Sequence, residues 1–103
     1  MTAHTTTKDK ALAAAALMER WADEVPMWTP GWNEPWYEFS QRRFEAEKLL
    51  ETRLRRQPSC DLWIEIDGTR VELTMSGIRV SSRACLAGAC RAWAAEVRRR
   101  AET

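Results

Sequence analysis

Two turn dipeptides between residues 61 and 81 constrain the fold of this chain more than any other feature. Asp67-Gly68 and Ser76-Gly77 each separate short runs in which apolar and polar residues alternate. Asp67-Gly68 is a strong signal for a two-residue type I′ hairpin turn, because both central residues of that turn need positive φ, and Ser76-Gly77 predicts a second, weaker hairpin. Read separately, the two turns place the same apolar side chains on one face of a sheet: Leu62, Ile64, Ile66, Val71, Leu73, Met75, Ile78 and Val80. A shift of one residue would scatter them over both faces.

The same turns predict which residues face each other across the strands. The predicted pairs are Ile66 with Thr69, Glu65 with Arg70, Ile64 with Val71, Trp63 with Glu72, Leu62 with Leu73, Met75 with Ile78, Thr74 with Arg79 and Leu73 with Val80. The second face of the sheet would then carry Trp63 among charged side chains. A lone tryptophan there should pack against the N-terminal helices or against a partner, so Trp63 is a candidate binding residue.

Helical spacing of apolar residues predicts two helices before the strands. The first covers residues 9–25 and stops at Pro26, because proline cannot continue a helix. The second starts at residue 34 or 35 and ends near residue 56, with a proline tolerated in its first turn. Its apolar stripe brings together Trp36, Phe39, Ala46, Leu50 and Leu54.

A third helix follows the strands and should cover the apolar face of the sheet, since a small sheet is not stable alone. Ser81 or Ser82 would cap it, and its buried stripe would be Leu86, Cys90, Trp93 and Val97. The sequence therefore predicts an α+β fold in the order α-α-β-β-β-α. Two N-terminal helices precede a three-stranded antiparallel β-meander, and a C-terminal helix packs on the sheet.

A chain of 103 residues is long enough for one domain and too short for two. We expect a single domain over residues 9–103, preceded by a disordered tail at residues 1–8. No apolar run approaches the ~20 residues needed to cross a bilayer, and residues 1–8 lack the apolar core of a signal peptide. These features predict a cytoplasmic protein.

Residue patterns for catalysis or metal binding are absent from the sequence. The three cysteines and the single histidine show neither CxxC nor HxxxH spacing, so we expect reduced, buried thiols and no metal site. No serine lies in a GxSxG turn, and no glycine-rich loop could hold a phosphate or a nucleotide cofactor. We therefore expect a protein that is not an enzyme and carries no cofactor.

Residues 26–37 carry more aromatic chemistry than a short connector needs. Three tryptophans, a tyrosine and a methionine lie among three prolines. Tryptophan and tyrosine dominate protein interfaces, because they bury a large area with few rotatable bonds. We expect Trp36 in the core and Trp28, Trp32 and Tyr37 in a partner-binding surface. The alternative is that these rings fold back over the core.

Arg43 and Glu47 form an i,i+4 charged pair inside the apolar stripe of the second helix. Such a conflict between charge and pattern often marks a place where function overrides packing. Both residues are therefore candidate partner-binding residues. The alternative is that both side chains extend along the edge of the core and reach water.

Two arginine clusters suggest a second class of function. They are formed by Arg53, Arg55, Arg56, Arg98, Arg99 and Arg100. Such clusters can bind nucleic-acid phosphates, although basic residues also complement the last turn of a helix. Nucleic-acid-binding domains commonly have a pI above about 9. The pI of this sequence is about 7.7, which favours the structural interpretation.

In size, and in the strand-turn-strand-helix ending DGTRVELTMSGIRVSSRACLAGACRAW, the chain resembles the small single-domain accessory proteins of temperate phages. These include inhibitors of host defence such as anti-CRISPR proteins, and the resemblance implies a host protein complex as the partner. We therefore expect a non-enzymatic protein that binds and masks a surface on a larger protein. The alternative is a nucleic-acid-binding or transcription-related module that uses the arginine clusters.

Overall fold

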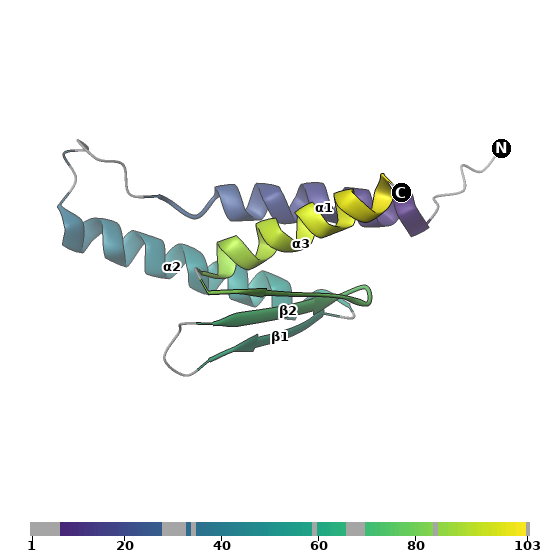
Figure 1. The fold of residues 1–103 in the computed structure, drawn as a ribbon. Coiled ribbons are helices and arrows are strands. Elements are labelled where there is room, and N and C mark those ends of the chain that lie inside the picture. Colours follow the sequence, from purple (N-terminus) through teal and green to yellow (C-terminus); the bar gives the residue numbers. More distant parts are fainter. Residues whose placement is uncertain are drawn as a thin grey trace.

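The predicted order of elements is confirmed (Figure 1). The computed structural model describes residues 7–27, 33, 35–58, 60–65, 70–83 and 85–102. Its elements are α1 (Thr7–Asp23), α2 (Trp36–Arg55), β1 (Cys60–Ile64), β2 (Val71–Met75), β3 (Ile78–Ser82) and α3 (Leu86–Ala101). The helices lie on one side of the sheet, with α3 between α1 and the strands.

The sheet has the predicted antiparallel order β1-β2-β3 and the predicted register. The confirmed pairs are Ile64 with Val71, Trp63 with Glu72, Leu62 with Leu73, Met75 with Ile78, Thr74 with Arg79 and Leu73 with Val80. Ser76 and Gly77 have positive φ angles of 53° and 77°, as a type I′ turn requires. The Asp67-Gly68 turn lies outside the described residues. The Glu65 N–H nevertheless donates to the Arg70 carbonyl at 2.9 Å, as that hairpin requires.

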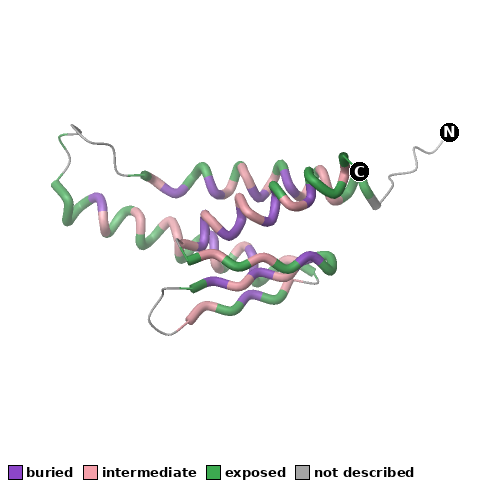
Figure 2. The backbone as a smooth tube through the Cα atoms, viewed as in Figure 1, coloured by how far each residue is buried: buried purple, intermediate pink, exposed green. Residues whose placement is uncertain are grey.

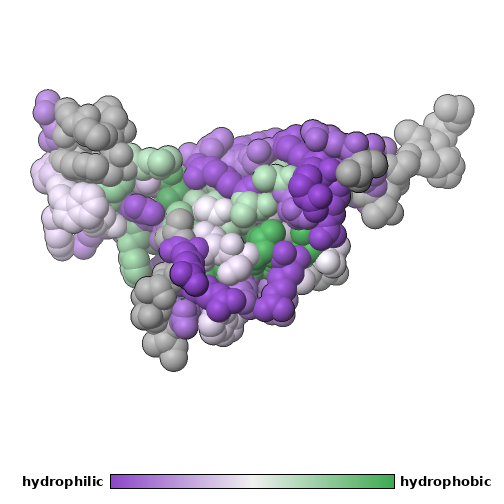
Figure 3. Space-filling view, in the orientation of Figure 1, coloured by the Kyte–Doolittle hydropathy of each residue, from purple (hydrophilic) through white to green (hydrophobic). Residues whose placement is uncertain are grey.

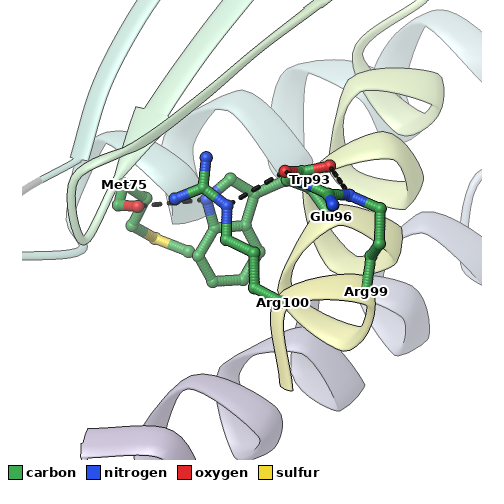
Figure 4. Close-up of polar contacts among 5 residues, drawn as sticks. All are labelled: Met75, Trp93, Glu96, Arg99 and Arg100. Atoms are coloured by element: carbon green, nitrogen blue, oxygen red, sulfur yellow. Dashed lines mark hydrogen bonds and ion pairs between the residues drawn. The ribbon is translucent and has the colours of Figure 1, made fainter. Parts of the chain in front are cut away.

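Helix α3 covers the sheet through the predicted stripe. Leu86, Cys90, Trp93 and Val97 are all buried. The Trp93 indole N–H donates to the Met75 carbonyl at 3.0 Å, which fixes the helix over the β2–β3 turn (Figure 4).

The predicted serine cap of this helix is wrong. Ser81 and Ser82 still pair with β2, so the sheet continues through both residues and the helix begins later. Cys85 is the N-cap, and its thiol accepts a hydrogen bond from the Gly88 N–H at 3.3 Å.

Helix α1 packs against α3 through small side chains. Ala15 and Ala22 on α1, and Ala89 and Ala94 on α3, are completely buried, which lets the two helices approach closely. Ion pairs of Glu19 with Arg98 and of Asp23 with Arg91 join the same two helices. The helix begins at Thr7, so residues 7 and 8 are helical rather than part of the predicted tail. Residues 1–6 lie outside the described part of the chain.

Helix α2 joins the main hydrophobic cluster only in its C-terminal half, although Phe39 near its start is also buried, with 2% exposure. Leu50 and Leu54 are buried with 2% and 0% exposure, whereas Trp36 is 61% exposed, so its prediction as a core residue is wrong. The reason is length. The 20-residue helix spans about 30 Å. A five-residue strand spans only about 17 Å. The N-terminal half of α2 therefore extends past the sheet, and exposed residues are frequent along it (Figure 2).

Candidate functional site

The projecting half of α2 carries exposed aromatic rings, which we call the aromatic face: Trp36, Tyr37 and Phe44. These residues are 61%, 71% and 59% exposed. Local contacts hold two of the rings. The Gln41 amide donates to the Tyr37 hydroxyl at 2.9 Å, and the Lys48 ammonium lies 4.7 Å from the centre of the Phe44 ring. Rings that are held in place before binding lose little entropy when a partner covers them.

A cavity of about 360 Å³, which we call the α2 groove, lies between the middle of α2 and the neighbouring ends of the sheet and α3. Phe44 and Glu47 are on its α2 wall. Ile64, Val71 and Leu86 form the opposite wall, at the ends of β1 and β2 and the start of α3. A second hollow of about 510 Å³ runs beside Tyr37 along α2, and Phe44 lines both. The aromatic face and the α2 groove therefore form one continuous surface.

Arg43 and Glu47 lie on the wall of the α2 groove. The Arg43 Nε and Glu47 Oε1 atoms are 3.7 Å apart, and the two side chains are 38% and 30% exposed. Glu47 Oε1 is itself inaccessible to water and accepts no hydrogen bond in the structure. The pair thus places a carboxylate on the wall of the groove, where a partner's N–H group could reach the exposed part of the Glu47 side chain.

Trp63 is not part of this surface. Trp63 and its neighbour Ile64 point to opposite faces of the sheet, and Trp63 lies on the face that no helix covers. It is 48% exposed and faces Glu72 on the neighbouring strand. Two guanidinium groups contact Glu72, from Arg79 at 2.8 Å and from Arg70 at 2.6 Å. The hydrogen bond from Arg79, more than any other contact, lowers the pKa of Glu72. Trp28 and Trp32 lie outside the described residues.

Most arginines of the two predicted clusters contact carboxylates. Arg53 pairs with Glu24 and Arg98 with Glu19, while Arg55 lies 3.5 Å from Glu51 and donates to the Leu62 carbonyl at 3.2 Å. The Arg55 contact covers a backbone carbonyl of β1, an edge strand that would otherwise be open to pairing. These arginines tie elements of the fold together.

Glu96 on α3 holds two more arginines of the clusters (Figure 4). Arg99 Nε donates to Oε2 at 3.0 Å and Arg100 Nε to Oε1 at 2.9 Å. These hydrogen bonds lower the pKa of Glu96 from 4.5 to about 2, and the bond from Arg99 has the largest effect. In the described chain, Arg56 alone of the six cluster arginines has no carboxylate contact among the ion pairs of the structure.

The cysteines are free thiols placed in or beside the core. Cys90 is buried, and burial raises the pKa of its thiol to about 12, with further contributions from Cys60 and Cys85. Burial also raises the pKa of Cys60. A thiol is a poor nucleophile when its pKa is high, because little thiolate forms near neutral pH. Cys60 and Cys85 are partly exposed, so the expectation of buried thiols holds only for Cys90.

Two other features bear on the site. Among the described residues, no three histidine, cysteine or acidic side chains are grouped so as to bind a metal ion. None of the described helices combines the length and the apolar character needed to cross a bilayer.

Sequence reasoning found part of this surface and missed the rest. It selected Tyr37, Arg43 and Glu47, which α2 brings to one side. It assigned Trp36 to the core and left Phe44 out of the site. Phe44 follows Tyr37 by seven residues, about two helical turns, so this spacing was a signal for a shared face. The wall at Ile64 and Leu86 comes from distant segments, which no local pattern could reveal.

Comparison of the chain with known protein families, with curated proteins and with solved structures finds no match.

Proposed function

We propose that this protein is a non-enzymatic binder that masks a surface on a larger protein, using the aromatic face and the α2 groove. The observation that carries the proposal is the exposed aromatic row on a helix that extends past its own core. Trp36 and Tyr37 are 61% and 71% exposed. Large exposed apolar surfaces on small proteins commonly mark interaction sites.

The chemistry of the surface indicates what the partner presents. Phe44, Ile64 and Leu86 offer an apolar cavity large enough for one or two side chains. Arg43 and Lys48 alternate with Glu47 and Glu51 along α2, so charges of both signs surround the cavity. The best fit is an apolar side chain of the partner, flanked by a basic group that reaches Glu47 and an acidic group that reaches Arg43 or Lys48. An amphipathic helix presents such a pattern.

The resemblance to temperate-phage accessory proteins adds a class of partner. We place the target among the protein complexes of a host defence system, where covering one essential surface is enough for inhibition. This function needs neither a catalytic group nor a cofactor.

Nucleic-acid binding is the weaker candidate because most of the cluster arginines already contact carboxylates. Arg53, Arg98, Arg99 and Arg100 already face carboxylates, which reduces the positive charge that these clusters offer to phosphates. Uncompensated basic groups are what release counterions from a nucleic acid on binding.

The test compares two double changes on one helix. Partner candidates are captured with the wild-type chain, and the affinity of each purified candidate is then measured for three proteins. Tyr37→Ala with Phe44→Ala removes two rings of the aromatic face. Leu49→Ala with Thr52→Ala removes exposed side chains from another side of α2, and Leu49 is 52% exposed. We expect the first variant to weaken binding by at least about thirtyfold and the second by less than about threefold.

Equal losses in the two variants would contradict the use of this face. Binding of duplex DNA that weakens steeply with salt, and that Tyr37→Ala with Phe44→Ala leaves intact, would favour the nucleic-acid module instead. Melting temperatures of both variants should stay near that of wild type, because every changed side chain is exposed.

A further inference from the structure

A second cavity lies at the opposite end of the molecule from the projecting half of α2. The first turns of α1, the last turns of α3 and the β2–β3 turn meet there, near the C label in Figure 1. Its volume is about 410 Å³. Ala11, Ile78, Val97 and Ala101 provide an apolar lining, and Ile78 and Val97 are only 8% and 3% exposed. The lining is therefore continuous with the core.

Cationic groups surround this apolar lining. Lys8 and Lys10 contribute from α1, and Arg100, which also pairs with Glu96, contributes from α3. The Ser76 hydroxyl lines the same cavity and can donate a hydrogen bond. No acidic residue is among the described residues that line it. Figure 3 shows the same character on the visible face, where hydrophobic surface between α3 and the sheet is bordered by hydrophilic side chains.

We propose that this cavity binds a small amphiphile with one aliphatic chain and a carboxylate headgroup. The chain would lie on Ala11, Ile78 and Val97, and the carboxylate would lie near the cationic side chains of Lys8 and Lys10 that line the cavity. Apolar walls with a few placed polar groups are the usual composition of small-molecule sites. A neutral ligand would leave the lysines unused, and a small inorganic anion would leave the apolar lining open to water.

The size of the cavity selects one chain rather than two. About 410 Å³ is near the lower end of the range for small-molecule sites, roughly 300–1,000 Å³. A two-chain phospholipid would leave most of its apolar surface in water. This inference does not depend on the proposed function, because none of the residues that line the cavity belongs to the aromatic face or the α2 groove.

The experiment uses decanoate below its micelle concentration, with backbone amide shifts followed by NMR. Decanol has the same chain without the charge, and acetate has the charge without the chain. We expect saturable shifts from decanoate at Ala11, Ile78 and Ala101, at least tenfold weaker binding of decanol, and no binding of acetate. Binding of decanoate should weaken as salt is raised, because its headgroup is near the surface.

Two variants locate the site. Lys8→Gln with Lys10→Gln removes the exposed charges and should weaken decanoate binding by about tenfold. Arg42→Gln with Arg56→Gln removes two exposed cations at α2, away from the cavity, and should leave it unchanged. Ala101→Trp fills the cavity and should abolish binding.

Three outcomes would overturn the proposal: equal binding of decanoate and decanol, shifts confined to the aromatic face, or equal weakening by the two glutamine pairs. Binding to vesicles of anionic phospholipid that persists in Ala101→Trp would also overturn it, because it would assign the lysines to a membrane surface.

Discussion

Trp93 in the middle of α3 and Trp36 at the start of α2 have opposite environments. Each lies on the apolar stripe of its helix. Trp93 is completely buried and donates to the Met75 carbonyl, while Trp36 is 61% exposed, with its ring centre 5.7 Å from that of Phe39. Trp36 and Leu54 are 18 residues apart, which is five full helical turns, so both point in the same direction. The difference is that Trp93 lies within the main hydrophobic cluster, whereas this cluster ends along α2 before it reaches Trp36.

This contrast teaches that the helix pattern alone does not decide burial. A stripe is buried only as far as another element extends beside it, and α2 is longer than the strands that it accompanies. The residues left over, Trp36 with Tyr37 and Phe44, then become surface that is available to another molecule. The elements that pack together, which are α1, α3, the sheet and the C-terminal half of α2, maintain the fold. The projecting half of α2 is available for binding.

The largest expected effect separates the two tryptophans. Trp93→Ala should lower the free energy of unfolding by about 3–5 kcal/mol, because it opens a large cavity and leaves the Met75 carbonyl without its indole donor. Trp36→Ala should lower it by less than about 1 kcal/mol. Urea unfolding of both variants provides the measurement. Similar losses would mean that the projecting half of α2 is part of the cooperative core.

The next largest effect concerns the turn between β2 and β3. Gly77→Val should lower the free energy of unfolding by about 1–2 kcal/mol, since a β-branched residue is strained at a φ of 77°. Nothing lies within 4 Å of a Cβ added there, so the loss is caused by the backbone alone. Gly77→Asn is the control and should cost less, because asparagine tolerates positive φ. An unchanged melting temperature for Gly77→Val would argue against the assigned turn.

A smaller effect concerns pH and the surface of α3. The Glu96 carboxyl has its pKa lowered to about 2, so the folded protein keeps this charge at pH values where the unfolded chain gains a proton. Its stabilising contribution is complete above about pH 4.5 and is lost as the pH falls towards about 2. Glu96→Gln should therefore flatten the decline in stability over this interval. Glu45→Gln, on the exposed side of α2, is the matched control, and an equally flattened curve for it would contradict the assignment.

The parts of the fold that could be predicted from the sequence depend on short-range patterns. Ser76-Gly77 fixes its own turn, and the alternation along β2 fixes the register of both neighbours, because a shift of one residue would expose Leu73. The apolar stripe of α3, from Leu86 to Val97, could also be predicted because it depends only on the spacing of residues within one helix. Two of the wrong predictions, Ser81 or Ser82 as a cap and Trp36 as a core residue, concern the point at which one element ends relative to another.

The site could be predicted only in part for the same reason. Tyr37, Arg43 and Glu47 share a helix, so their spacing in the sequence is enough to place them on neighbouring faces. The opposite wall of the α2 groove combines Ile64 and Leu86, and their proximity depends on how α3 crosses the sheet. Their apolar character predicted burial in the core, which is equally consistent with a cavity wall.

The smallest expected change in stability is the most informative about the projecting half of α2. Arg43→Ala should lower the free energy of unfolding by less than about 1 kcal/mol, because the pair with Glu47 is partly exposed and such pairs contribute little. The Glu47 side chain is 30% exposed and can turn towards water once Arg43 is gone.

In the complex the balance differs, because a partner that covers the α2 groove excludes water from the same carboxylate. Arg43→Ala should then speed dissociation by roughly tenfold or more while leaving the association rate nearly unchanged. Arg42→Ala, one residue away and exposed, should change neither rate and is the control. A loss of about 3 kcal/mol in the free protein would instead mean that the groove is closed and that Arg43 belongs to the core. The projecting half of α2 would then not differ from the elements that pack around the core.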